Sequence, residues 1–516
     1  MKRGLQILAP LLVASLPLPA LAQDDGAAQP AALGLDPANP QTTALPGGVT
    51  PAYHQPSTEQ GDWRFDFHGF MTVPVRASFN KREAPLDGQS ETTWHAPPIV
   101  PDYRDSFNYT GVVPQPYVKL LFSYGNSIVT GNISIEARST YTGSSYFDPP
   151  SNPGITDAFL NFKLPEIAKD SLFQVNVGSF SNRYGTMGEY DEGRYGQPII
   201  ARTNAVGENI FAAFQLGELA LMIEQGIGGL TDKTPVGVVP DGWNNFGDWN
   251  AGASWVNHLH AGLGYKGMAT LGLHYMTAWS QDDRVSSSLA DGRIDVLGAD
   301  LRLTLGHFGH FYLGGSYTNA DRSRTVGRVI EILNAPGGKG LMDNYLGPQS
   351  AGTGKLVTIG GQYDLSVGRL LRYPTPFAGD APDIVVSLFG MLTNVESDDV
   401  TQGVDPTTGE TFSLYDGVRK MKFGAEASYS FLAWLAASAR FDHVNPNSEN
   451  DKFRYTAISP RVIFRSGWNA HDQVVLQYTR FLYSDLTTVR SGYPPADDVS
   501  VFPDEDMISL SASMWW

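Results

Sequence analysis

From residue 63 onward, long stretches of the chain alternate between apolar and polar residues. In residues 421–431, for example, Met421 and Phe423 fall on one face, whereas Lys422 and Glu426 fall on the other. Successive side chains of a strand point to opposite sides, so this period of two predicts strands with one apolar and one polar face. About eighteen such stretches follow one another, near 63–79, 113–125, 127–141, 155–164, 172–181, 206–217, 219–228, 250–265, 268–280, 293–306, 308–320, 355–371, 383–395, 418–432, 434–445, 452–466, 471–483 and 505–516.

The joins between these stretches alternate between short and long. Gly125-Asn126, Gly217-Glu218 and Lys266-Gly267 are short joins. The long joins are polar and rich in Gly, Pro and Asp, and they lie at 80–112, 142–154, 182–205, 229–249, 281–292, 321–354, 396–417 and 484–504. This regularity predicts an up-and-down meander with short turns at one end and long loops at the other.

The length of the stretches favours a membrane barrel over a soluble sandwich, which would also alternate. They run to about ten to fifteen residues, whereas strands of globular proteins usually have about five or six. A strand that crosses a bilayer at a tilt needs about nine to eleven residues, and closure into a barrel satisfies the backbone groups of a sheet in hydrocarbon. We therefore expect an all-β fold, a transmembrane up-and-down antiparallel β-barrel of about eighteen strands, with sixteen as the alternative. Its short turns would be periplasmic and its long loops extracellular.

The N-terminal part of the chain does not share this pattern. Lys2 and Arg3, a short apolar run and Ala20-Leu21-Ala22 predict a secretory signal peptide over residues 1–22. Residues 23–62 are rich in Ala, Pro, Gly and Gln and show no apolar periodicity, so we expect a disordered periplasmic tether. A plug inserted into the lumen is the alternative for this segment. The barrel would then occupy residues 63–516.

Composition and motifs exclude several classes of function. The chain carries 36 Lys and Arg against 53 Asp and Glu, and this acidic balance argues against a nucleic-acid partner. It has no cysteine, which excludes disulfides, thiolate metal sites and cysteine nucleophiles. A GxSxG motif is absent, and His258 with His260 would supply only two metal ligands on one strand face. We expect no enzymatic activity, no metal and no cofactor.

Two features resemble known outer-membrane barrels. The last strand alternates and ends in Trp516, which is similar to the terminal strand of Gram-negative outer-membrane barrels, although those usually end in Phe. Residues 157–164, followed by 173–180 and by Arg183-Tyr184-Gly185, resemble paired strands of bacterial porins. In that family the next long loop folds into the lumen and narrows it, which implies the same role for residues 182–205 here. The resemblance identifies no subfamily.

Two groups of residues are candidates for the pore, because a barrel of about eighteen strands leaves an aqueous lumen unless something plugs it. The third long loop supplies the candidate constriction, which comprises Arg183, Tyr184, Glu189, Tyr190, Asp191, Glu192, Arg194 and Tyr195. The polar strand faces supply a lumen wall of mixed charge, which comprises Arg64, Asp66, Lys119, Glu136, Arg138, Asp300, Arg302, Lys422, Glu426, Arg440, Asp442, Arg461 and Arg465. Acidic loop residues opposite a basic wall would set a transverse field across the narrowest point. The alternatives are an exposed charged loop and wall charges that only pair and stiffen the barrel.

Together these patterns predict a porin-like protein of a Gram-negative outer membrane that lets small hydrophilic solutes or ions diffuse passively. Its other partners would be outer-membrane lipid and lipopolysaccharide. The number of subunits stays open, and a homotrimer is one option. The main alternative is a substrate-specific transporter or exporter of an oligosaccharide or a hydrophobic molecule, for which Phe159, Phe211, Trp255 and Phe389 would form an aromatic track. A structural barrel is a further alternative.

Overall fold

The structure, a computed structural model, describes residues 63–78, 117–139, 151–164, 171–187, 197–231, 253–281, 292–323, 326, 329–332, 346–347, 349–371, 382–404, 409–449, 454–467, 472–484 and 505–516. The expected signal peptide, the expected tether and most of the predicted long loops other than 182–205 and 396–417 lie outside these residues. The part of the chain that the structure describes is almost entirely β-strand.

The strands follow one another with few other elements between them. In chain order they are β1 (Arg64–Ser78), β2 (Tyr117–Gly125), β3 (Val129–Ser139), β4 (Ser151–Leu164), β5 (Ser171–Met187), β6 (Gln197–Leu216), β7 (Leu219–Thr231), β8 (Ala253–Tyr265), β9 (Ala269–Gln281), β10 (Arg293–Thr304), β11 (His310–Asp321), β12 (Ile330–Glu331), β13 (Gly354–Ser366), β14 (Asp383–Ser397), β15 (Gln402–Val404), β16 (Thr411–Ser413), β17 (Arg419–Leu432), β18 (Leu435–Asn445), β19 (Tyr455–Phe464), β20 (Asp472–Tyr483) and β21 (Glu505–Trp515). Two short helices, η2 (Gly306–Phe308) and α4 (Val367–Leu371), lie between strands. Within the described residues, no helix has both the length and the apolar character to cross a bilayer.

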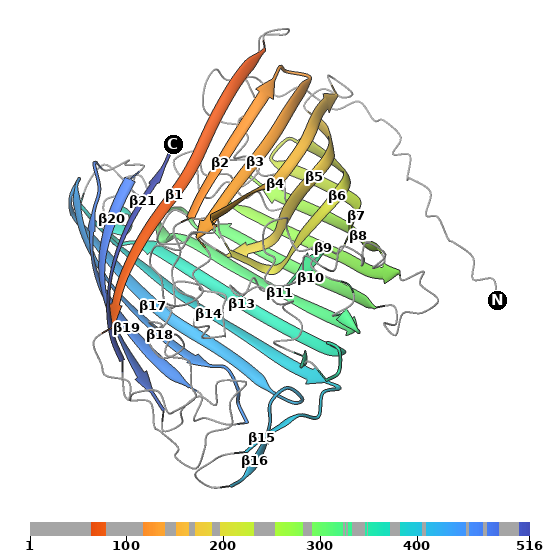
Figure 1. Ribbon diagram of the computed structural model, residues 1–516. Helices are drawn as coiled ribbons and strands as arrows, with labels where there is room; N and C mark the ends of the chain where they lie inside the picture. The colour runs from red at the N-terminus through yellow and green to blue at the C-terminus, as the bar shows by residue number, and fades with distance from the viewer. Residues whose placement is uncertain are drawn as a thin grey trace.

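All strands except β15 and β16, which pair only with each other, form one antiparallel sheet that closes into a ring (Figure 1). The first strand, β1, pairs with β2 on one side and with the last strand, β21, on the other. Each remaining wall strand pairs with the wall strands before and after it in the chain. The sheet has 19 strands, and one of them, the two-residue β12, pairs with β6 alone, so eighteen strands make up the ring. The predicted antiparallel barrel and its strand number are confirmed.

Each wall strand presents one apolar face to the outside of the ring, as the alternation predicts. On β10, Leu297 is 61% exposed on this outer face, whereas its neighbour Val296 is fully buried on the inner face. Leu259 of β8 and Ile359 of β13 are exposed in the same way. In water, an apolar surface of this extent would be unfavourable, but in hydrocarbon it is the exterior that a closed barrel requires.

Charged pairs on the outer face lie near the long-loop ends of the strands. Arg293 pairs with Asp295 on β10, and Arg480 of β20 pairs with Asp506 of β21. Glu208 is also exposed on the outer face, and it lies close to Val206, where β6 stops pairing with β7. Charges cost much less at the interface of a bilayer than at its midplane, so these positions are compatible with a barrel that crosses one.

Two predicted boundaries are corrected by the structure. The sequence predicts a loop over 182–205, but 182–187 continue β5 and 197–205 belong to β6, because these residues pair with each other inside the ring. The strand predicted over 355–371 ends at Ser366, where the chain turns into α4. Asp383 fixes this turn, since its carboxylate accepts hydrogen bonds from the Ser366 hydroxyl and from the N–H of Gly368.

At the long-loop end, Asp399 connects two loops. Its carboxylate accepts hydrogen bonds from the N–H groups of Gln349 (2.7 Å), Ser350 (3.3 Å) and Thr401 (2.9 Å), and from the Thr401 hydroxyl. Burial alone would raise the pKa of Asp399, but these hydrogen bonds outweigh burial and hold the pKa below its usual value. The ionised form of Asp399 therefore stabilises the connection between the loops.

We expect this connection to be lost in acid. Because the pKa of Asp399 is lower in the folded state, its contribution to stability is complete above the unfolded pKa, near about 4, and disappears as the pH falls below that value. Amide hydrogen exchange at Gln349, Ser350 and Thr401, corrected for the intrinsic rate, should therefore accelerate in acid. Asp399→Ala should already exchange fast at neutral pH, whereas Asp398→Ala, at the exposed neighbouring residue, should not. Slow exchange in Asp399→Ala would contradict the assignment.

Candidate functional site

The tip of the β5–β6 hairpin leaves the wall and folds into the ring. Strand β5 pairs with β4 only as far as Ser179, and β6 pairs with β7 only as far as Val206. Beyond these residues, β5 and β6 pair with each other, and β12 adds a third strand through the pairs Ile330–Thr203 and Glu331–Arg202. We call residues 180–205 the inner hairpin. The structure describes it except for its tip at 188–196.

Two glycines and one carboxylate determine where the inner hairpin leaves the barrel wall. Gly178 and Gly207 are cross-strand partners, and Gly178 has a φ of +139°. A Cβ on either residue would overlap the backbone of the adjacent wall strand, so glycine is required where the strands pass so close. Asp157 of β4 then replaces the lost wall partner of β5, because its carboxylate accepts hydrogen bonds from the N–H (3.0 Å) and the hydroxyl (3.1 Å) of Ser181.

A groove of glycines on the wall receives the second strand of the inner hairpin. Gly298, Gly314 and Gly360 lie on the inner faces of β10, β11 and β13, and Gly314 pairs with Gly360. A Cβ on Gly298 would lie 2.7 Å from Ile200, and a Cβ on Gly314 would lie 2.8 Å from Ile199. We call these three residues the glycine groove. Ile199 and Ile200 fill the space that the missing side chains leave, and both are almost completely buried.

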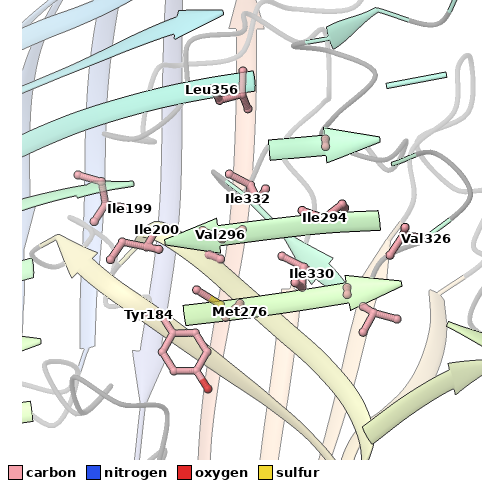
Figure 2. Packing of buried hydrophobic residues seen from close by; sticks show 14 of the residues in the cluster. Tyr184, Ile199, Ile200, Met276, Ile294, Val296, Val326, Ile330, Ile332 and Leu356 are labelled. Atoms are coloured by element: carbon pink, nitrogen blue, oxygen red, sulfur yellow. The ribbon is translucent and has the colours of Figure 1, made fainter. Parts of the chain in front are cut away.

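An apolar core surrounds the groove. Figure 2 shows Tyr184, Ile199 and Ile200 of the inner hairpin beside Met276 of β9 and Val296 of β10. All five side chains are buried, and burial of apolar surface stabilises the contact by roughly 25 cal/mol per Å². The inner face of the wall is therefore apolar where the hairpin covers it, and this is why the hairpin lies against β8–β13.

A buried polar group lies next to this core and connects the hairpin to the wall. Glu224 of β7 accepts hydrogen bonds through Oε1 from the side-chain amides of Asn182 (3.1 Å), in the inner hairpin, and Asn209 (2.8 Å), in β6. The Nε2 atom of His258 lies 3.6 Å from Oε1 of Glu224, and the Nδ1 atom of His260 lies 3.6 Å from Oε2. One wall carboxylate thus holds a hairpin amide and faces two imidazoles of β8.

A third imidazole extends this group across the wall. The ring of His274 on β9 stacks on that of His260 with 4.2 Å between centroids, and its Nε2 contacts the carboxylate of Asp300 on β10. The ring of Tyr184 lies 5.2 Å from His258 and 5.4 Å from His274. We call Glu224, His258, His260, His274 and Asp300 the carboxylate–imidazole cluster. Among the described residues, no group of His, Asp and Glu side chains is arranged to hold a metal ion.

Charged residues pair with one another across the ring from the base of the hairpin. Arg440 of β18 donates two hydrogen bonds to Asp442, at 2.7 and 3.0 Å, and Lys422 Nζ of β17 lies 3.9 Å from the same carboxylate. Arg461 of β19 lies 3.4 Å from Glu426 of β17. These side chains are nearly fully buried. We call these five residues the wall ion network, and within it the predicted charges pair and join neighbouring strands.

The other predicted wall residues lie on several strands. Lys119 of β2 is buried and lies 3.9 Å from Asp157, and the guanidinium of Arg302 lies 4.9 Å above the ring of Tyr312. Arg465 donates hydrogen bonds at a short turn of the barrel. Arg64 and Asp66 lie on β1. Glu136 and Arg138 lie on β3, and the side chains of these two residues are outside the described part of the structure.

The predicted constriction residues are only partly described. Arg183 and Tyr184 lie on β5, whereas Glu189, Tyr190, Asp191, Glu192, Arg194 and Tyr195 lie outside the described residues. Tyr184 is fully buried against the wall, so it holds the hairpin in place instead of lining the opening. The transverse field from acidic loop residues therefore stays a prediction.

Three of the four aromatic residues named for the alternative transporter do not form a track along the lumen. Trp255 is exposed on the outer face of β8, because it is an odd number of residues from His258 and His260, which lie on the inner face. Phe211 and Phe389 are almost completely buried on the inner face, and Phe389 lies beneath the guanidinium of Arg440. Side chains that are buried in this way offer no path along which a solute would move.

Sequence reasoning missed the residues that hold the inner hairpin. Glu224 is a carboxylate on the otherwise apolar inner face of β7, and the Ile199-Ile200 pair stands inside a segment that was expected to be a polar loop. Both are departures from the local pattern, and such departures are the signal that would have identified them. The pairing of Glu224 with Asn182 depends on where the hairpin docks, which the alternation does not encode.

The fold and the site define a closed antiparallel barrel whose lumen contains an inward hairpin. No protein-family model matches the chain, and no curated protein sequence matches it. Among solved structures, it is similar to OccK2 (OpdF) of Pseudomonas aeruginosa, with 11% identity, a TM-score of 0.41, and coverage of 88% of this chain and 97% of that one. It is also similar to the outer-membrane protein OmpT of Vibrio cholerae, with 8% identity, a TM-score of 0.38, and coverage of 90% and 100%. Likenesses this weak carry no conclusion about function.

Proposed function

We propose that the chain forms a porin-like channel in a Gram-negative outer membrane, through which small hydrophilic solutes or ions diffuse passively. The observation that carries this proposal is the closed ring with an apolar exterior and polar inner wall, into which the inner hairpin folds. An eighteen-strand ring is too wide for its own wall side chains to fill. The proposal includes no catalytic step, metal or cofactor.

In this proposal the inner hairpin is the constriction. It leaves the wall at β5 and β6, crosses toward β10–β13, and so occupies part of the cross-section of the lumen. The acidic tip residues and the wall opposite them would then set the local field, and the signal peptide would deliver the chain for insertion. Lipid and lipopolysaccharide would contact the outer face, and assembly into a homotrimer is compatible with the proposal but is not required by it.

Planar-bilayer recording of the refolded protein tests the proposal. We expect ion conductance from the full barrel, and a reversal potential under a salt gradient will give the preference for cations or anions. Absence of conductance in every buffer, from protein that migrates as a folded barrel, would contradict the channel and favour a structural barrel or an occluded transporter.

Shortening the hairpin tests the constriction separately. Deletion of residues 188–193 removes most of the tip but leaves the docked segment 197–205 in place. We expect single-channel conductance to rise about twofold or more, because the narrowest section of a pore limits conduction. The matched control deletes an equal number of residues from 232–252, which join β7 to β8, and should leave conductance unchanged. Equal conductance in the deleted and intact channels would contradict the proposal that the hairpin is the constriction.

A further inference from the structure

The carboxylate–imidazole cluster brings together an unusual number of ionisable groups in a buried place. Glu224, His258, His260 and His274 are all at most 2% exposed. Oε2 of Glu224, Nε2 of His258, both ring nitrogens of His260 and Nδ1 of His274 have no hydrogen-bond partner among the described protein groups. Buried polar atoms are nearly always hydrogen-bonded in native proteins, whereas Oε2 of Glu224, Nε2 of His258 and Nδ1 of His260 make only longer contacts, of 3.6 Å, with ionisable partners.

Six of the strands around the cluster contribute a side chain to it or beside it. Glu224 comes from β7, His258 and His260 from β8, His274 from β9, and Asp300 from β10. The inner hairpin contributes the phenol of Tyr184 and the neutral amide of Asn182, and β6 contributes the neutral amide of Asn209. Three imidazoles thus share two carboxylates, and imidazole is the side chain whose ordinary charge change falls between about pH 5 and 8.

The geometry limits how many protons the cluster can hold while it keeps its shape. The rings of His260 and His274 lie parallel at 3°, with 4.2 Å between centroids. Two imidazolium ions at this distance in a buried site repel each other strongly, because little water is present to screen them. A first proton on an imidazole is balanced by Glu224 or Asp300, but three protons leave net positive charge and place both stacked rings in the charged form.

This limit acts directly on the inner hairpin. Its β5 strand is held to the wall by the Asn182 amide on Glu224 and by Tyr184, whose ring lies 5.2 Å from that of His258, 6.1 Å from that of His260 and 5.4 Å from that of His274. Its β6 strand stays paired with β5 and is held to the wall by Ile199 and Ile200 in the glycine groove. Separation of the stacked rings would disturb the first attachment without touching the second.

We propose that the carboxylate–imidazole cluster is a proton-operated anchor, which fixes the β5 side of the inner hairpin to the wall near neutral pH and releases it in acid. The functional consequence rests on the proposed channel, since the hairpin is its constriction. When the cluster takes up protons, β5 loses its side-chain contacts with β7, β8 and β9, while its pairing with β6 and the contacts of Ile199 and Ile200 in the glycine groove remain. The width of the opening then depends on the pH of the medium.

The experiment follows the hairpin itself and not the current through the channel. The chain has no cysteine, so Thr186→Cys provides a single thiol on the β5 side of the inner hairpin for a nitroxide spin label. In refolded barrels in lipid vesicles, we expect the spectrum to shift from the immobile to the mobile component as the pH falls from about 8 to about 5. His260→Gln and, separately, His274→Gln keep a polar side chain that cannot become charged, and each should reduce this shift or abolish it.

His443→Gln is the matched control, because His443 lies on the outer face of β18, where it contacts Phe423 and Thr456. This variant should retain the full shift. A pH-independent spectrum in the parent protein, or an unchanged shift in both His260→Gln and His274→Gln, would overturn the anchor. Conductance recorded from the same preparations separates the two proposals. A pH-dependent label in a barrel without conductance would refute the channel alone, whereas a conducting barrel with a pH-independent label would refute the anchor alone.

Discussion

Filling the glycine groove should release the inner hairpin and widen the channel. In a Gly298→Val/Gly314→Val variant, the new side chains would occupy the space of Ile199 and Ile200, since even a Cβ at these positions lies 2.7 to 2.8 Å from them. Valine is favourable in strands, so the wall itself should still form. We expect single-channel conductance to increase by about twofold or more, as for the tip deletion, because the hairpin no longer narrows the lumen.

The matched control places the same two valines on the outer face. In Gly131→Val/Gly390→Val, a Cβ meets its nearest atom at 3.6 Å on β3 and at 3.4 Å on β14, which are ordinary contacts. This variant should conduct like the parent barrel. If the groove variant also conducts like the parent while folding normally, then the groove does not hold the hairpin and the docking surface assigned to it is wrong.

Removing the carboxylate of Asp442 should destabilise the barrel more than any change on its surface. Asp442 is fully buried, accepts two hydrogen bonds from Arg440 and lies 3.9 Å from Lys422. Asp442→Ala deprives two buried cations of this carboxylate, and breaking a buried ion pair in this way typically costs about 3–5 kcal/mol. Urea unfolding of the barrel in lipid vesicles should show a loss of free energy of unfolding of about 3 kcal/mol.

The comparison for this measurement is Asp295→Ala. Asp295 bonds Arg293 at 2.7 Å, but the Arg293 side chain is 60% exposed. Exposed pairs of this kind usually contribute about 0.2–1 kcal/mol to stability. The free energy of unfolding of this variant should therefore differ from that of the parent by less than about 1 kcal/mol. Equal losses in the two variants would mean that the wall ion network is solvated and contributes little to stability.

The sequence was sufficient to predict the barrel wall. Alternation places Leu297 outside and Asp300 inside on β10 without any knowledge of partners, because the period of a strand is a local property. The strand number followed from counting such stretches, and closure followed from the requirement that no edge be left unpaired. The strand faces and the strand number are predictable because they depend on neighbours along the chain, whereas closure joins the first and last strands and follows only from the cost of unpaired edges.

The inner hairpin and its attachments could not be predicted in the same way. A resemblance to porin strands suggested that the segment after β5 turns inward, but the partners of Ile199 and Asn182 lie on strands that are distant in the chain. The inner faces of β9 and β10 were expected to be polar, and Met276 and Val296 are apolar there because the hairpin covers them. Local periodicity reports which face of a strand is buried, not what buries it.

The position of the glycine groove has a consequence for the order of assembly. The inner hairpin is made early in the chain, but its docking surface on β10, β11 and β13 and its third strand, β12, come much later. Contacts between distant segments carry a larger entropic cost and form late. We therefore expect the inner hairpin to stay undocked until β10, β11 and β13 have joined the wall, so that the interior narrows later than β5 and β6 form.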